Sequence, residues 1–172
     1  LEQNPNDFNA AAFSSPMLGL SSTTCFATKI LIGEKTKYAL GQGAYQPDYQ
    51  TFEKNELTGS EIRFNRMTTA FAEDTKARLG GPSYQWVYKS CEQFEYMNDH
   101  IKNIETPFIL FSAENESIVN TKAHEKFIEE ARELGKTCEA FLVENAQHEL
   151  FIEKDEQRIK TINQIFKYFN RY

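Results

Sequence analysis

The sequence predicts an α/β fold in which helices flank a parallel β-sheet. Two short apolar runs, residues 107–112 and 138–143, have the length and composition of strands that are buried on both faces. Between them apolar residues recur at helical spacing, and Gly135 stands where that helix would end. A strand, a helix and a strand in this order form a βαβ unit, so the two strands should be parallel and joined by a right-handed crossover.

A third strand and four further helices are expected elsewhere in the chain. Residues 9–15 form another short apolar run, which Pro16 would stop. Residues 36–58 are rich in Gly, Gln, Tyr, Pro and Asn and should form a loop. Apolar periodicity and capping residues indicate helices over residues 17–35, after Ser60, over 83–104 and over 154–170. The apolar faces expected on the last two helices are Trp86, Tyr88, Cys91, Phe94, Met97 and Ile101, and Ile159, Ile162, Ile165, Phe166 and Phe169.

An acidic loop and a histidine each follow the carboxyl end of a predicted strand. Glu114 and Glu116 come directly after residues 107–112, and His148 follows residues 138–143. The carboxyl ends of parallel strands point the same way, so the two loops can meet at the sheet edge where ligands bind in open α/β folds. A carboxylate bonded to one imidazole nitrogen fixes the tautomer, and the other nitrogen can then act as a general base. These residues supply two of the three parts of a nucleophilic hydrolase, in the chain order of the α/β-hydrolases.

Four stretches of the sequence carry a resemblance to a known family. They are residues 13–20, 79–87, 106–111 with the acidic loop after them, and 145–155. Together and in this order they are similar to the C-terminal part of bacterial lysophospholipases, which lie close to the monoacylglycerol lipases within the α/β-hydrolase superfamily. The resemblance implies a serine carboxylic-ester hydrolase, without a cofactor, that releases a fatty acid from a lysophospholipid or monoacylglycerol substrate. Two alternatives stay open: another α/β-hydrolase such as a peptidase, or a non-catalytic α/β module for binding or assembly.

The resemblance also implies how the chain is organised. Residues 1–16 would hold the end of the helix that follows the nucleophile and the first strand of the sheet. Residues 17–82 would form a helical cap, or lid, over the active-site mouth. Residues 83–172 would be the C-terminal half of the α/β-hydrolase core, with the acid and the histidine. The expected fold is therefore three parallel strands with flanking helices, plus a helical cap insertion.

The serine nucleophile of the family is missing from this sequence. In the α/β-hydrolases it lies in Gly-x-Ser-x-Gly, a strained strand-to-helix turn that exposes the serine. No such pentapeptide occurs, and neither Gly59-Ser60-Glu61 nor the stretch 19–22 fits it. The chain is therefore expected to be the C-terminal portion of a longer enzyme, inactive by itself because no acyl-enzyme can form. The missing N-terminal half of the same enzyme is its expected partner.

His148 is the expected catalytic base, and the acid is expected to be one of two glutamates. Alignment with the family through Ile118 and Val119 puts the acid position on Glu116. Glutamate is an accepted third member of hydrolase triads. Its side chain is one methylene longer than that of the usual aspartate, so Glu114 stays open as the alternative acid.

No metal ion is expected in the site. His124 and His148 are each followed by glutamate, as in the first half of a zinc-protease motif. Isoleucine stands at the fourth following position in both cases, where that motif needs its second histidine ligand. Both pairs therefore lack the spacing that metal binding requires.

Composition limits the remaining possibilities. The net charge of −6 argues against nucleic acid as a partner, because phosphate binding needs a basic surface. Cys25, Cys91 and Cys138 are odd in number and lack a regular spacing, which favours free thiols in a reducing compartment. A cytoplasmic location is therefore expected, with peripheral attachment to the inner membrane left open. No basic amphipathic anchor is evident.

Overall fold

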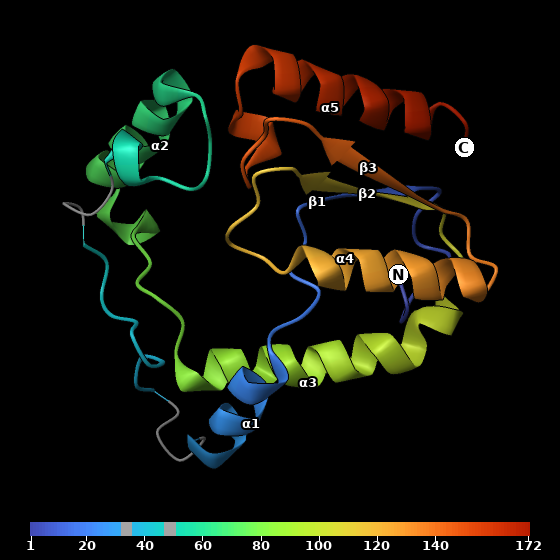
Figure 1. The fold of residues 1–172 in the computed structure, drawn as a ribbon, viewed down its shortest axis with the longest axis horizontal. Coiled ribbons are helices and arrows are strands. Elements are labelled where there is room, and N and C mark those ends of the chain that lie inside the picture. Colours follow the sequence, from blue (N-terminus) through green and yellow to red (C-terminus); the bar gives the residue numbers. More distant parts are fainter. Residues whose placement is uncertain (32–35, 47–50) are drawn as a thin grey trace.

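A parallel sheet forms the centre of the molecule (Figure 1). The computed structural model describes residues 1–31, 36–46 and 51–172. Within these residues the sheet has the strand order β1-β2-β3, and β2 pairs in parallel with both neighbours. The α/β class and the three parallel strands expected from the sequence are confirmed. The strands are β1 (Ala11–Ser14), β2 (Phe108–Ala113) and β3 (Cys138–Val143).

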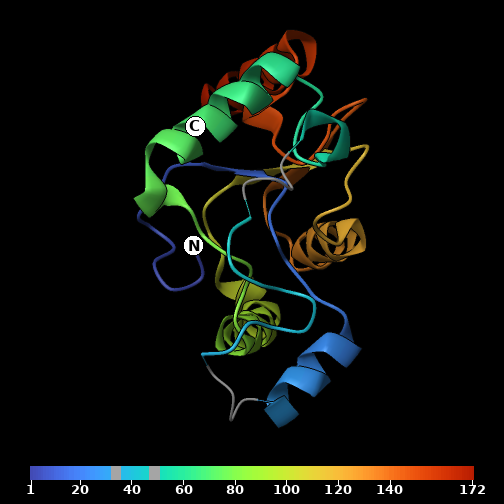
Figure 2. The same ribbon diagram turned by 90° about the vertical axis from the view of Figure 1, so that its left-hand side faces the viewer.

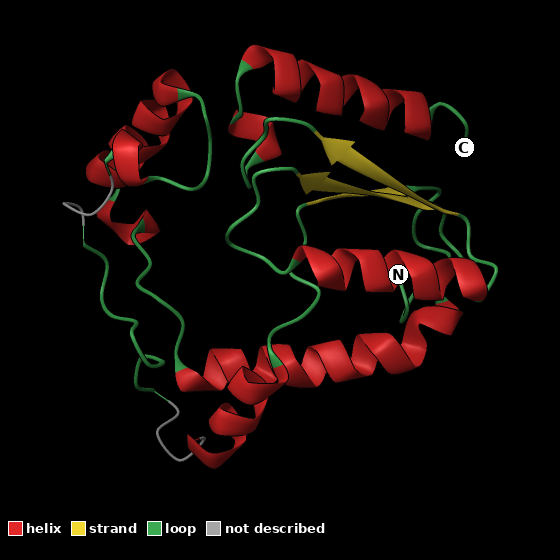
Figure 3. Cartoon of the chain, viewed as in Figure 1, coloured by secondary structure: helices red, strands yellow, loops and turns green. Residues whose placement is uncertain are grey.

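Helices cover both faces of this sheet (Figure 3). On one side lie α4 (Thr121–Glu133) and α3 (Tyr84–His100), and on the other lies α5 (Asp155–Phe169). The central strand β2 contributes side chains to the core on both sides of the sheet, because successive side chains of a strand point in opposite directions. Phe108 and Leu110 pack with Phe127, Ile128 and Ala131 of α4, whereas Ile109 and Phe111 pack with Leu150 and Tyr168. Burial on both faces explains why β2 is an unbroken apolar run.

Local residues explain where the helix between β2 and β3 begins and ends. The side chain of Asn120 accepts a hydrogen bond from the amide of Lys122 at 3.1 Å, which satisfies one of the first free N–H groups of α4. At the other end Gly135 has φ 70, and its amide donates to the carbonyl of Arg132 at 2.9 Å. A left-handed residue just past a helix is most easily glycine. The predicted end of this helix at Gly135 is confirmed.

The first ten residues differ from the prediction, because they form turns and not the end of a helix. The amide of Asp7 donates to the carbonyl of Asn4 across one such turn, at 3.3 Å. Proline, asparagine and aspartate all favour turns, and this segment contains Pro5 between two asparagines. The hydroxyl of Thr106 donates to the carbonyl of Pro5 at 2.9 Å and holds the segment against the start of β2.

The 17–82 segment leaves the sheet after β1 and returns to it through α3 (Figures 1 and 2). Its longer elements are α1 (Ser22–Leu31), which lies against α3, and α2 (Glu61–Glu73). Helix α1 is shorter than the predicted 17–35, and Gly33, its expected end, lies outside the described residues. The described parts of the predicted loop 36–58 are irregular, apart from one short 3-10 turn at Phe52–Lys54.

A disulfide between Cys25 and Cys91 joins α1 to α3. The prediction of free thiols is therefore wrong for these two cysteines, and holds for Cys138. The two half-cystines are 66 residues apart in sequence, and only the packing of α1 on α3 brings their Cα atoms to 5.7 Å. A sequence gives no measure of that distance, which is what decides whether two cysteines can pair. The bridge closes a covalent loop around most of the 17–82 segment.

The buried face of α5 differs from the predicted one, whereas that of α3 largely agrees with it. On α5 the buried side chains are Gln157, Thr161 and Tyr168, whereas Ile159 is 50% and Phe166 62% exposed. The predicted apolar face of α5 is thus partly solvent-facing, although Ile165 of that face packs against the core cluster that contains Ile109 and Tyr168. On α3 Cys91 and Phe94 of the predicted face are buried, as is Ile101 just after the helix, and Trp86 is 51% exposed. Among the described residues, no helix is both long enough and apolar enough to cross a lipid bilayer.

Breaking the Cys25–Cys91 bridge should destabilise the protein. A disulfide that closes a loop of 66 residues restricts the unfolded chain, so its loss is expected to lower the free energy of unfolding by about 2–4 kcal/mol. Urea unfolding of the wild type, with and without dithiothreitol, measures this difference. The double variant Cys25→Ser/Cys91→Ser should match the reduced wild type, and Cys138→Ser should keep the full response to reductant. Equal stability of the oxidised and reduced wild type would contradict the prediction.

Candidate active site

The loops that follow β2 and β3 are held together by hydrogen bonds that continue the strand pairing. The amide of Glu114 donates to the carbonyl of Val143 at 3.1 Å, and the amide of Asn115 donates to the carbonyl of Ala146 at 2.9 Å. Both loops leave the sheet at the carboxyl ends of its strands. This pairing brings the predicted acidic loop beside the loop that carries His148.

His148 and Glu116 are in direct contact at this sheet edge. The ring Nδ1 of His148 lies 2.9 Å from Oε2 of Glu116. The Glu116 side chain is fully buried, and the His148 side chain is 17% exposed. An ionised carboxylate can only accept, so Nδ1 carries the proton of this bond and Nε2 of the neutral ring holds the lone pair. The pair has the geometry in which an acid orients an imidazole for proton transfer.

Glu116 is kept ionised by the donors around its two oxygens. Its Oε1 accepts the amides of Ile118 at 2.8 Å and Val119 at 3.1 Å, while Oε2 accepts from His148. Burial of the carboxyl raises its pKa, but the hydrogen bonds from His148 and from the two amides outweigh burial and hold the pKa below its usual value. Glu116 is therefore a buried anion at neutral pH, suited to stabilise a protonated imidazole.

Glu114, the alternative acid, has a different partner. Its side chain is exposed, and Oε2 accepts the amide of Asn145 at 2.7 Å. Asn145 has φ 56, a left-handed conformation that asparagine tolerates in a turn. Glu114 thus supports the turn that precedes His148. Of the two candidates, it is Glu116 that the structure brings to the imidazole.

Ser15 is a feature of this sheet edge that the sequence did not reveal. It directly follows β1, has φ 41 and is 4% exposed. Among the described residues its buried hydroxyl has no hydrogen-bond partner. A positive φ is uncommon outside glycine, and such strained residues concentrate at functional sites. No local pattern marks this backbone angle, so the only available signal was its place at the end of a strand.

The other two histidines have structural partners. His124 is buried, with Nδ1 2.8 Å from the hydroxyl of Ser112 and Nε2 2.6 Å from the carbonyl of Pro16. It joins α4 to β2 and to the chain just past β1. His100 stacks on Tyr96 and bonds the carbonyl of the same residue through Nδ1, at 2.8 Å. Within residues 1–31, 36–46 and 51–172 there is no group of three side chains suited to hold a metal ion.

A cavity of about 490 Å³ lies between α1, α3 and the first turn of α4. Apolar side chains of Leu18, Leu20, Phe94 and Phe127 contribute to its walls, together with the disulfide. Asn120, at the start of α4, also lines it. Asn120 is the lining residue nearest to Glu116 in the sequence, four positions away, and neither Glu116 nor His148 is among the lining residues.

Solved structures with a similar fold are α/β-hydrolases. A soluble variant of monoglyceride lipase from Saccharomyces cerevisiae, in complex with a substrate analog, matches with a TM-score of 0.66 at 18% identity, over 93% of this chain and 55% of that one. Monoacylglycerol lipase from Paleococcus ferrophilus matches with a TM-score of 0.62 at 16% identity, over 97% of this chain and 60% of that one. Both likenesses establish the fold. This chain has the architecture of an α/β-hydrolase, with three parallel strands flanked by helices.

Sequence comparison gives the family. The model of the family described as serine aminopeptidase, S33, matches residues 1–155. Lysophospholipase L2 of Escherichia coli K12 is 30% identical over 183 residues, which cover all of this chain and 53% of that protein. The chain thus spans about half the length of this relative. It belongs to the serine aminopeptidase S33 family of α/β-hydrolases, and its predicted resemblance to lysophospholipases and monoacylglycerol lipases is confirmed.

The lowered pKa of Glu116 predicts a pH-dependent contribution to stability. A carboxyl whose pKa is lower in the folded than in the unfolded chain stabilises the fold above its unfolded pKa, and this contribution is lost as the pH falls through the folded pKa. The difference in unfolding free energy between the wild type and Glu116→Gln should therefore be largest near neutral pH and should shrink as the pH falls below about 4.5, the ordinary pKa of a glutamate carboxyl. Urea unfolding of both proteins across this range measures it. A difference that stays constant with pH would show that Glu116 does not act as a buried anion.

Proposed function

We propose that this chain is the C-terminal part of a serine carboxylic-ester hydrolase that releases a fatty acid from a lysophospholipid. The observation that carries the proposal is the 2.9 Å contact between His148 Nδ1 and Glu116 Oε2 at the carboxyl edge of the sheet. Monoacylglycerol is the second substrate of the same class. The similarity to lysophospholipase L2 and to monoglyceride lipase supports both.

In this mechanism the nucleophile is a serine that lies outside the chain. Nε2 of His148 takes the proton of that serine as its oxygen attacks the acyl carbonyl, and Glu116 stabilises the imidazolium that forms. The tetrahedral intermediate collapses, and His148 gives the proton to the departing glycerol oxygen. Water then attacks the acyl-enzyme with His148 again as the base, which releases the fatty acid and restores the serine.

The N-terminal half of the same enzyme is the proposed partner of this chain. Among the described residues β1 pairs with β2 alone, so the other edge of β1 offers unpaired backbone groups to a further strand. Next to this edge Phe8 is 59% and Phe169 39% exposed, and both line a hollow that also includes Tyr172. A further part of the sheet that carries the serine would cover these groups. The relatives that are about twice as long support this arrangement.

The 17–82 segment is the proposed cap over the acyl group. The cavity beneath α1 offers apolar side chains that suit an acyl chain, and the charged side chains of Lys29, Glu95, Lys122 and Lys126 also line it. Phe26 of α1, which also lines this cavity, and Ile30 of the same helix are each 68% exposed, and Trp86 of α3 is 51% exposed. Large apolar side chains of this kind can insert into a lipid interface. They support peripheral contact with the membrane that would supply the substrate.

An oxidising compartment fits the chain better than the cytoplasm. The expectation of a cytoplasmic location depended on free thiols, and two of the three cysteines form a disulfide. Structural disulfides are rare where glutathione and thioredoxin keep thiols reduced. The proposed location is therefore a compartment in which the Cys25–Cys91 bridge can persist.

Aminopeptidase activity is the second candidate function, favoured by the description of the family that matches residues 1–155. The same acid and base would serve amide hydrolysis, so the site geometry does not separate the two. Turnover of a lysophospholipid and of an amino-acid p-nitroanilide by the complete enzyme, measured side by side, separates them. Hydrolysis of the anilide alone would replace the proposed function by this one.

Loss of His148 or Glu116 should abolish most ester hydrolysis by the complete enzyme. Glu116→Gln keeps the shape of the side chain but removes the charge that stabilises the imidazolium, so kcat should fall by about 10⁴-fold, and His148→Ala should cost at least as much. Glu114→Gln is the matched control, because it removes a nearby glutamate that bonds a backbone amide, and its effect should be far smaller. Release of fatty acid from a lysophospholipid is the assay. An equal loss in Glu114→Gln and Glu116→Gln would contradict the assignment of the acid.

The chain of 172 residues should show no ester turnover by itself. Without the serine no acyl-enzyme can form, although the acid and the base are in place. A chromogenic short-chain ester, assayed with this chain and with the complete enzyme, tests this expectation. If the chain alone turns over the ester and Ser15→Ala removes that activity, the nucleophile lies in this chain and the proposed division of the site is wrong.

A further inference from the structure

A second buried carboxylate lies five residues after His148. Glu153 is 0% exposed, and it stands between the 3-10 turn Leu150–Ile152 and the start of α5. Its Oε1 accepts the amides of Gly59 and Gln147, each at 2.8 Å. Its Oε2 accepts the amide of Lys154 at 2.8 Å. Both oxygens are thus occupied by backbone donors, which leaves Glu153 unsuited to contact a substrate.

The three donors come from three places in the chain. Gly59 belongs to the chain that enters α2, Gln147 directly precedes His148, and Lys154 begins α5. Around this carboxylate the chain that enters α2 is also bonded to the His148 loop directly. The amide of Glu149 donates to the carbonyl of Leu57 at 2.7 Å.

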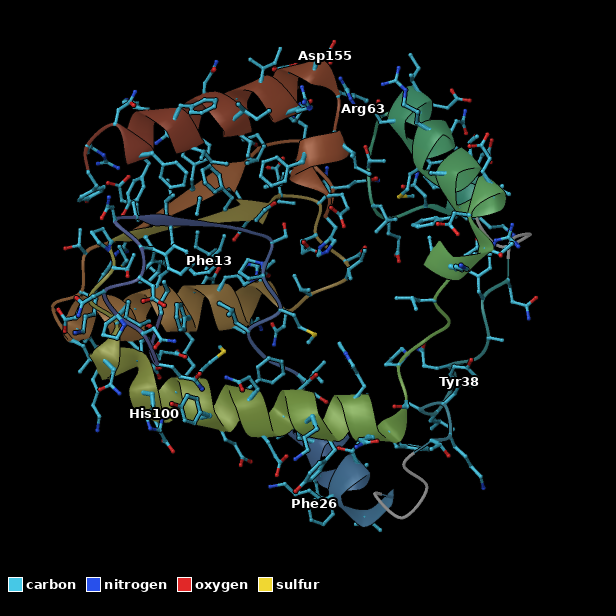
Figure 4. The ribbon with its side chains drawn as sticks, turned by 180° about the vertical axis from the view of Figure 1, so that it is seen from behind. Phe13, Phe26, Tyr38, Arg63, His100 and Asp155 are labelled. Atoms are coloured by element: carbon cyan, nitrogen blue, oxygen red, sulfur yellow. A yellow bond between two sulfur atoms is a disulfide. The ribbon has the colours of Figure 1, made fainter. Side chains whose placement is uncertain are left out.

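Further contacts join the same two regions. The hydroxyl of Thr58 donates to the carbonyl of Ile152 at 2.7 Å. Arg63 Nη1 donates to the carbonyl of Glu153 at 2.6 Å, and Arg63 also forms an ion pair with Asp155 (Figure 4). Glu153 lies where these contacts converge.

A buried charge is costly unless its hydrogen bonds are all made. Short bonds from backbone amides to a carboxylate are strong, and they fix the positions of the donors as firmly as that of the acceptor. The Gln147 amide is one residue from His148, so any movement of the carboxylate moves the backbone that carries the imidazole. Gly59 permits this approach, because a Cβ there would lie 3.2 Å from Oε2 and 3.5 Å from Oε1 of Glu153.

We propose that Glu153 is a positioning residue, which holds the His148 loop in register with Glu116 and ties that loop to the entry of α2. The inference depends on the function proposed above, since it assigns Glu153 to the same site. Glu153 also couples the position of the 17–82 segment to that of His148, because its Oε1 accepts the amides of both Gly59 and Gln147.

The direct test is the state of the His148 ring in Glu153→Gln. Glutamine has the same size but turns an NH2 group toward one of the amide donors, so at least one of the three bonds must break. In the wild type at about pH 9, where an imidazole is neutral, long-range ¹H–¹⁵N spectra should show His148 with its proton on Nδ1. In Glu153→Gln this single tautomer should give way to a mixture. Thr161→Val is the matched control, since Thr161 is also fully buried but bonds only the carbonyl of Gln157 within α5, and it should keep the wild-type ring signals.

Catalysis by the complete enzyme gives the second measurement. A displacement of the base on the order of 1 Å should lower kcat by roughly 10- to 100-fold in Glu153→Gln with KM little changed. Gly59→Ala crowds the carboxylate without removing it and should cause a smaller loss of the same kind. Thr161→Val should retain the wild-type kcat even if it lowers the stability.

The outcomes separate this inference from the proposed function. Unchanged ring signals and unchanged kcat in folded Glu153→Gln would overturn the positioning role. If Glu153→Gln does not fold, the ring signals and kcat of Gly59→Ala decide in its place, and wild-type values there would overturn the role too. If the wild-type enzyme hydrolyses no ester, the proposed function fails, whereas the ring signals still decide whether Glu153 positions His148.

Discussion

The parallel pairing of β2 with β3 is the constraint on which the candidate site depends. Its hydrogen bonds extend past the strands, because the amides of Glu114 and Asn115 donate to the carbonyls of Val143 and Ala146. Two loops that are far apart in sequence therefore leave the sheet side by side. The acid and the imidazole need no unusual side-chain reach to meet, and their relative position is as rigid as the sheet. A similar edge serves ligand binding throughout open α/β folds.

Two buried glutamates contact His148 or the residue before it. Glu116 bonds the ring itself, and Glu153 bonds the backbone one residue before it. The oxygens of each carboxylate accept three hydrogen bonds, two from backbone amides and one from the ring at Glu116, and three from backbone amides at Glu153. Glu116 thus sets the tautomer of the ring, and the proposed role of Glu153 is to fix the backbone next to it.

Several contacts among the described residues attach the 17–82 segment to the rest of the molecule, and they include a β-bridge between Tyr38 and Ser83. The Cys25–Cys91 disulfide fixes its first helix to α3, and the contacts around Glu153 fix the entry of α2 to the His148 loop. The disulfide and the Glu153 contacts hold two different parts of the segment, α1 and the entry of α2. In the proposed hydrolase they would set where the acyl group enters relative to the base.

Local patterns in the sequence determined the three strands, the helix ended by Gly135 and the loops that carry Glu116 and His148, because periodicity, caps and turn residues act over a few neighbours. The choice between Glu116 and Glu114 required the tertiary structure. Both residues lie in the same loop, and the sequence does not show which of the two side chains points toward His148. The disulfide, the strained Ser15 and the contacts of Glu153 were also decided by tertiary structure. Each depends on the distance between segments remote in the chain, and that distance is set by how helices and loops pack on the sheet.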